Sequence, residues 1–122
     1  FAYLRRAIEL DDALPYDEPW GWMQPTRHAY GALLLEQGHV EEAARVYAAD
    51  LGLDPTLSRS SHHPNNVWSL HGYHECLRRL GRDAEAVIIG QQLELARARA
   101  DVAVNASCAC RLEVADPCCG GE

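Results

Sequence analysis

The chain has 122 residues, enough for one domain with a modest hydrophobic core. Its 18 acidic residues against 11 basic ones give a formal net charge of −7, which disfavours binding to nucleic-acid phosphates and to anionic lipids. No apolar run approaches the roughly 20 residues that a membrane-spanning helix needs. We therefore expect neither nucleic acid nor a membrane among its partners.

Residues 2–13 have a helical pattern, and we expect them to form the second helix of a unit that begins before Phe1. The chain would then be a piece of a longer protein. A linker, residues 11–25, follows this helix and contains three prolines, which cannot lie inside a helix.

The linker and the start of the next helix form a first candidate site. Its aromatic and acidic side chains predict a pocket for a ligand or a peptide, because aromatic groups supply a large contact area at a small entropic cost. In the alternative interpretation, the two tryptophans of the linker only fill the gap between successive hairpins. The residues of this site are Tyr16, Asp17, Glu18, Trp20, Trp22 and Arg27.

A first helical hairpin is predicted over residues 25–54. Apolar residues at helical spacing, Tyr30 and Leu33 to Leu35 among them, form one face of its first helix. Gly38 permits a tight turn, and a second amphipathic helix then ends near Pro55.

A second hairpin, predicted over residues 66–98, repeats the first after a loop extension at residues 56–65. Gly81 matches Gly38 and Ala86 matches Ala43, both at an offset of 43 residues. Alanine at these positions lets two helices cross closely, because a larger side chain would push their axes apart.

The first hairpin resembles the tetratricopeptide repeat (TPR), a helix-turn-helix unit of about 34 residues. The residues that carry the resemblance are Gly31, the turn residue Gly38, the close-contact Ala43, the aromatic Tyr47 and the closing Pro55. In the second copy, His74 and Gly90 stand where the family usually has a small residue and an aromatic one.

The resemblance covers about residues 1–98 and implies an all-α solenoid of about two and a half repeats. The repeat domain would span residues 1–104, and a Cys-rich tail would span residues 105–122. The stretch YDEPWGWMQPTRHAYGALLLEQGHVEEA is also similar to the carboxy-terminal region of longer, mostly uncharacterised TPR proteins of bacteria and fungi. About three repeats are usually needed for stability, so we expect a missing amino-terminal part or a partner, such as a second copy, over the exposed end.

A TPR-like fold implies a protein-binding scaffold, whose partner is a peptide or a helix in a concave groove lined by the first helix of each hairpin. We expect no cofactor in this role. A further alternative is self-association, in which stacked repeats form filaments. The side chains expected to bind the partner are Trp20, Trp22, Arg27, Tyr30, Leu34, His71, His74 and Arg78.

His71 and His74, one helical turn apart, support a competing interpretation in which the chain is a metal carrier or a metal-dependent enzyme. Two imidazoles at this spacing can bind one Zn or Cu ion. Further ligands would come from His62, His63, Cys108 and Cys110. In the alternative, both histidines are ordinary groove-lining or half-buried residues. No Walker, Gly-x-Ser-x-Gly or metalloprotease motif is present, so we expect no other catalytic site.

The carboxy-terminal tail holds four of the five cysteines. Adjacent cysteines bridge each other with difficulty, so we expect a disulfide from Cys108 or Cys110 to Cys118 or Cys119, with free thiols and metal binding as alternatives. Asn105 begins a glycosylation sequon, which matters only in a secreted protein. The cysteine pattern leaves both a cytoplasmic and a secreted location open.

Overall fold

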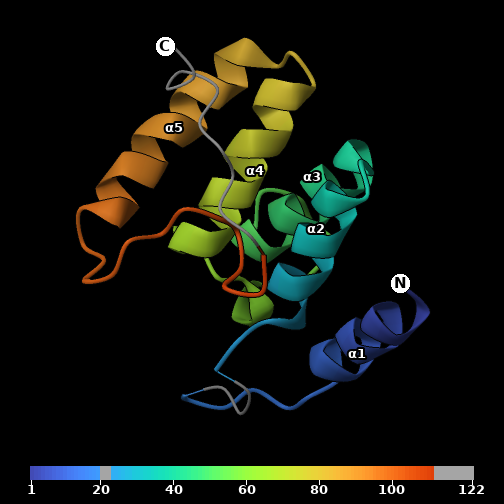
Figure 1. Ribbon diagram of the computed structural model, residues 1–122. Coiled ribbons are helices and arrows are strands. Elements are labelled where there is room, and N and C mark those ends of the chain that lie inside the picture. Colours follow the sequence, from blue (N-terminus) through green and yellow to red (C-terminus); the bar gives the residue numbers. More distant parts are fainter. Residues whose placement is uncertain (20–22, 112–122) are drawn as a thin grey trace.

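The computed structural model describes residues 1–19 and 23–111, and within them every regular element is a helix. The expected all-α class is therefore confirmed. No helix in this part of the chain is long and apolar enough to cross a membrane. The α-helices are α1 (Ala2–Asp12), α2 (Thr26–Glu36), α3 (Val40–Leu51), α4 (Val67–Arg79) and α5 (Asp83–Arg97), and a short 3₁₀ helix spans Arg59–Ser61 (Figure 1).

The helices pack as two hairpins, α2 with α3 and α4 with α5, and each helix lies inside its predicted range. Both turns contain a glycine in the left-handed conformation, Gly38 (φ 81°) and Gly81 (φ 69°). Residues that have a Cβ rarely adopt this conformation. In each turn, the backbone N–H that follows the glycine donates to a carbonyl five residues earlier, at 2.8 and 2.9 Å. The two turns therefore have the same local structure.

The hydrophobic core lies where α3 packs against both α2 and α4. Ala43 and Ala86 are 0 % and 2 % exposed, which confirms their predicted burial in the hairpins. The ring of Tyr47, from α3, lies against glycines of the two neighbouring helices. A Cβ at Gly31 of α2 would lie 2.5 Å from this ring, and one at Gly72 of α4 would lie closer still. Only glycine at both positions leaves room for the buried aromatic ring.

Each hairpin is joined to the helix before it by a hydroxyl–carboxylate hydrogen bond. Thr26 Oγ1 donates to Asp11 of α1 at 2.9 Å, and Ser69 Oγ donates to Asp50 of α3 at 2.6 Å. Thr26 and Ser69 are 43 residues apart, so the contact recurs at matched positions of the two hairpins. The helix α1 thus attaches to the first hairpin in the way that the first hairpin attaches to the second.

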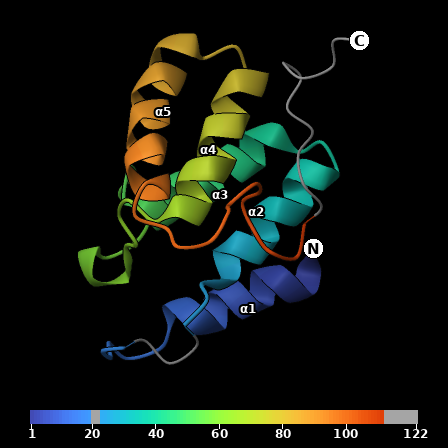
Figure 2. The same cartoon turned by 60° about the vertical axis from the view of Figure 1, so that its left-hand side comes forward.

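An extended segment, residues 101–111, runs from the end of α5 across to α2 (Figures 1 and 2). Its buried residues are Val104, Ala106, Ser107 and Cys108. The hydroxyl of Tyr47 donates to Ser107 Oγ at 2.6 Å. Arg111 forms ion pairs with Glu36 of α2 (2.6 Å) and Glu75 of α4 (2.7 Å). This segment therefore binds both hairpins.

Candidate binding site

A buried carboxylate, Asp50, lies in the last turn of α3 and is 1 % exposed. Side chains from α2, from the loop before α4 and from α4 converge on its two oxygens. The contacting atoms are Nε2 of His28 (3.0 Å), Nδ1 of His63 (2.7 Å), Nδ2 of Asn66 (3.0 Å) and Oγ of Ser69 (2.6 Å). The carboxylate thus holds together elements that are distant in the sequence.

These contacts set the charge of Asp50 and the tautomers of the two histidines. Burial by itself would raise the pKa of Asp50, but the hydrogen bonds from His28, His63 and Ser69 outweigh burial and hold the pKa below its ordinary value. An ionised carboxylate can only accept hydrogen bonds. Therefore Nε2 of His28 and Nδ1 of His63 carry the shared hydrogens.

The loop between α3 and α4 positions the donors around Asp50. The backbone N–H of His63 donates to the carbonyl of Asp50 at 2.7 Å. Asn66 caps α4, because its side-chain oxygen accepts a hydrogen bond from the backbone N–H of Ser69 at 2.9 Å. The residues that begin α4 therefore also surround the buried carboxylate.

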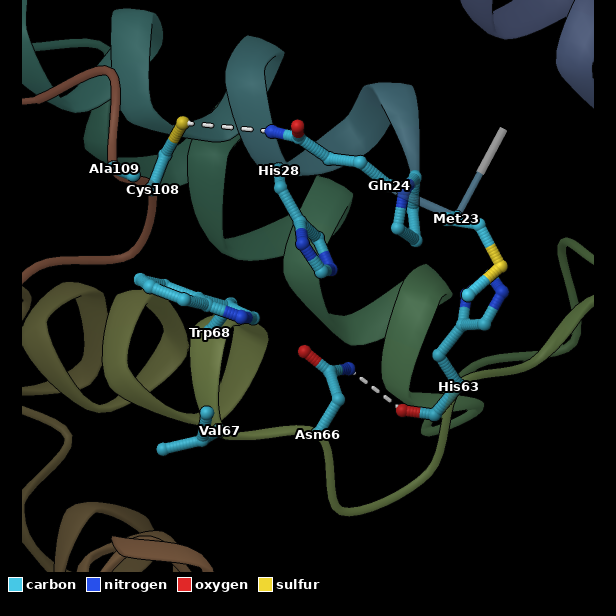
Figure 3. Close-up of a pocket in the computed structure, with 10 residues that line it drawn as sticks. Met23, Gln24, His28, His63, Asn66, Val67, Trp68, Cys108 and Ala109 are labelled. Carbon is cyan, nitrogen blue, oxygen red and sulfur yellow. Dashed lines mark hydrogen bonds between the residues drawn. The ribbon is translucent and has the colours of Figure 1, made fainter. Parts of the chain in front are cut away.

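A pocket of about 450 Å³ opens beside this cluster, and we call it the histidine pocket (Figure 3). The imidazole of His28 reaches into it from α2, and Trp68 borders it from α4 (Figure 3). The lining residues are Met23, Gln24, Pro25, His28, His63, Asn66, Val67, Trp68, Cys108 and Ala109. Apolar surface and groups that form hydrogen bonds are thus combined, as in ordinary ligand sites.

A second pocket, of about 660 Å³, adjoins the histidine pocket, since both are lined by Pro25 and His63. We call it the acidic pocket. Five carboxylate side chains line it, against two arginines. These charged residues are Asp11, Asp12, Asp17, Glu18, Asp50, Arg27 and Arg59.

The first candidate site predicted from the sequence coincides in part with the acidic pocket. Tyr16, Asp17, Glu18 and Arg27 all line it, so the structure brings these predicted residues together. Trp20 and Trp22, which were expected beside them, lie outside the described residues. Partner binding at these residues stays a prediction.

The side chains expected in a groove on α2 are instead used within the chain. Arg27 forms an ion pair with Asp12 at the end of α1. The hydroxyl of Tyr30 contacts Arg5 and Glu42, and Leu34 is fully buried in the core. The physical reason is that α1 packs against one part of α2, while the hydrophobic core takes up Leu34.

The side chains expected in the groove on α4 have three different environments. His71 is buried, and its Nδ1 has no hydrogen-bond partner among the described residues. Burial, together with the positive charges of Arg97 and Arg111, lowers its pKa to about 4. His74 packs over Gly90 of α5, and Arg78 is exposed. The extended segment 101–111 lies over the neighbouring part of α4, where Arg111 binds Glu75.

The alternative metal ligands do not form a cluster in residues 1–19 and 23–111. No group of three or more His, Cys, Asp or Glu side chains in these ranges is arranged to hold a metal ion. His62 contacts the carbonyl of Leu57, and His63 is bonded to Asp50. Cys76, which follows these histidines in the sequence, is fully buried in the core, and burial raises the pKa of its thiol to about 12.

The cysteine tail differs from the expectation. Cys108 is joined to Cys110 by a disulfide, whereas we expected a bridge from this pair to Cys118 or Cys119. A turn after Cys108, closed by a backbone hydrogen bond from Arg111 to the Cys108 carbonyl at 3.1 Å, brings the pair together. Cys118 and Cys119 lie outside the described residues.

Asn105, the glycosylation candidate, is exposed. Ser107, the third residue of its sequon, is fully buried against Tyr47.

Comparisons with family models, with curated proteins and with solved structures found no match to this chain. The candidate site therefore depends on the geometry of this molecule alone.

The site residues predicted from the sequence did not include His28, Asp50, Asn66 or Trp68. One signal for His28 was available, because a histidine recurs 43 residues later, at His71. The signal for Asp50 is weaker. This residue interrupts the apolar face at the end of α3, whereas the matched residue of α5 is the apolar Leu93.

Proposed function

We propose that this chain is a TPR-like repeat scaffold that binds a segment of another polypeptide across the histidine pocket and the acidic pocket. The observation that carries this proposal is that the two pockets share the lining residues Pro25 and His63. A site made of two neighbouring pockets suits a polypeptide, because its successive side chains can each occupy one of them. The paired hairpins and the recurring junctions at Thr26 and Ser69 support the repeat assignment.

The location follows from what covers the rest of α2 and α4. The extended segment 101–111 and the helix α1 already pack against these helices, and the residues of α2 and α4 that line a pocket, Arg27, His28, Val67 and Trp68, all lie at the amino-terminal ends. The excess of carboxylates in the acidic pocket favours a basic residue of the partner there. The histidine pocket would receive a side chain with apolar surface, since Met23, Val67 and Trp68 line it.

Selection from a random 12-residue peptide library on the immobilised full chain tests the proposal. We expect enrichment of peptides that combine a basic residue with an aromatic one, and binding is then measured with synthetic peptides by fluorescence polarisation. Trp68→Ala removes one wall of the histidine pocket and should weaken binding at least about fivefold, since interface aromatic residues often contribute more than about 1 kcal/mol.

Val87→Ala is the matched control, because Val87 is an exposed apolar residue of α5 that lines neither pocket. It should leave the affinity unchanged. The proposal fails if no peptide is enriched, or if the enriched peptides bind the Trp68→Ala variant as tightly as the wild type.

A further inference from the structure

His28 offers one fixed hydrogen-bond acceptor to the histidine pocket. Its Nε2 donates to Asp50, so in the neutral ring the free lone pair lies on Nδ1. The two ring nitrogens of His28 cannot exchange these roles, because the ionised carboxylate of Asp50 has no hydrogen to donate to Nε2. Both of its oxygens instead accept hydrogen bonds from other side chains. The carboxylate therefore acts as a positioning group that fixes which nitrogen of His28 can accept.

Within residues 1–19 and 23–111, Nδ1 of His28 forms no hydrogen bond. The ring nevertheless lines the histidine pocket, where it lies between Gln24 and Trp68 (Figure 3). A polar atom at the wall of a ligand site that has no partner in the chain is suited to a partner in the ligand.

The surroundings of His28 define the chemical class of that ligand group. Trp68 and Met23 provide aromatic and thioether surface, which pack well against another aromatic ring. The volume of about 450 Å³ is large enough to admit an aromatic side chain. The occupant should therefore have an aromatic body and an O–H or N–H at its tip.

We infer that the histidine pocket receives an aromatic side chain of the bound polypeptide, a tyrosine foremost, whose hydroxyl donates to Nδ1 of His28. This inference rests on the proposed function and names the residue type that the partner presents. The hydrogen bond is supported by the Asp50 carboxylate behind the imidazole, since linked hydrogen bonds strengthen one another.

The test compares two soluble probes, N-acetyltyrosinamide and N-acetylphenylalaninamide, by NMR titration of the ¹⁵N-labelled full chain. The probes differ only in the hydroxyl group. We expect the tyrosine probe to bind about tenfold more tightly, as one added hydrogen bond allows, and to shift the ring resonances of His28. Equal binding of both probes would overturn the inference.

His28→Gln gives a second, independent measurement. The glutamine amide can still donate to Asp50 in place of Nε2, but it places no acceptor where Nδ1 was. The preference for the tyrosine probe should disappear in this variant. His71→Gln, at the matched position of the second hairpin and away from both pockets, should keep the preference.

The outcomes separate this inference from the proposed function. If library peptides bind but the two probes bind equally, the scaffold function stands and the role of His28 is wrong. If the tyrosine probe is preferred but no peptide is enriched, the pocket chemistry stands and polypeptide binding is wrong. An unfolded His28→Gln variant, detected by its amide spectrum, leaves the two-probe comparison on the wild type to decide.

Discussion

In both hairpins a ring on one helix packs over a glycine on the other, but the helix that carries the ring differs between the two hairpins. In the first, the ring of Tyr47 on the second helix packs over Gly31 of the first helix. In the second, His74 on the first helix packs over Gly90 of the second helix. These are matched positions, each 43 residues apart. At each crossing one ring thus packs over one glycine, and either helix can supply the ring.

The hairpins also differ in the hydrogen-bond partners of a buried histidine at matched positions. His28 and His71 are matched, but His28 faces the carboxylate of Asp50, whereas the residue matched to Asp50 is Leu93. At His71 the buried Nδ1 has no hydrogen-bond partner in the described part of the chain, and burial lowers the pKa of this histidine to about 4. The Asp50 carboxylate fixes the tautomer of His28 through Nε2, and Leu93 cannot do the same for His71.

Replacing that carboxylate should have the largest effect. Asp50→Leu copies the second hairpin into the first and leaves the donors of His28, Asn66 and Ser69 without their acceptor. We expect the free energy of unfolding to fall by about 3–5 kcal/mol, measured by urea denaturation. Asp101→Leu, at an exposed position, is the control and should change it by less than about 0.5 kcal/mol. Equal midpoints for the two variants would show that the cluster does not stabilise the fold.

The buried His71 should make stability depend on pH. Its folded-state pKa of about 4 lies below the ordinary value of 6.5, so as pH falls through this window the unfolded chain binds the proton first. The free energy of unfolding should therefore decrease by up to about 3 kcal/mol between pH 6.5 and pH 4. Urea denaturation at several pH values measures the slope.

His71→Gln should remove most of that slope. His74, whose pKa is also lowered by burial, would account for a remainder of the same sign. His39→Gln, at an exposed position, should retain the wild-type slope. A wild type whose stability is constant over this range would contradict the assigned state of His71.

Adding a methyl group at the two crossings should have opposite effects. Gly31→Ala forces a Cβ to within 2.5 Å of the Tyr47 ring, which costs about 1–3 kcal/mol, and the gain of about 1 kcal/mol in helix propensity offsets only part of this. In Gly90→Ala the nearest atom is the flexible His74 ring at 3.2 Å, so we expect a neutral change or a gain of up to about 1 kcal/mol. Thermal unfolding would measure both, and the same sign for both would refute the packing argument.

The smallest effect is expected at the hydroxyl of Tyr47, which has no counterpart at Gly90. Tyr47→Phe keeps the ring but removes the donor to Ser107, at a cost of about 1 kcal/mol. Combining it with Ser107→Ala should cost less than the sum of the single changes, because both remove the same hydrogen bond. Tyr3→Phe, on a residue that is 94 % exposed, is the control.

The hairpins could be predicted from the sequence because their signals are local. Gly38 and Gly81 mark the turns, and the apolar spacing around Tyr47 and Leu77 marks the buried faces of neighbouring helices. The exchange of ring and glycine at His74 and Gly90 was visible as a departure from the family pattern. Its meaning needed the structure, since a contact between helices depends on which side chain faces which gap.

The candidate site could be predicted only in part. Tyr16 to Glu18 of the linker do line a pocket, together with Arg27 of α2, because the prolines keep the linker out of a helix. The cluster around Asp50 combines donors from three separate segments, and no local spacing encodes such a meeting. The ion pair of Arg27 depends on Asp12 of α1, and no local pattern in the sequence shows which side chains of α2 this helix contacts.

The extended segment 101–111 couples ligand binding in the histidine pocket to its own docking on α2 and α4. Its residues Cys108 and Ala109 form one wall of the histidine pocket, while Arg111 is tied to α2 and α4. A ligand that rests on this wall favours the docked arrangement of the segment, and by reciprocity a change that releases the segment weakens the ligand. Ligand binding in the pocket and docking of the segment 101–111 on α2 and α4 are thus thermodynamically linked, so either one reports on the other.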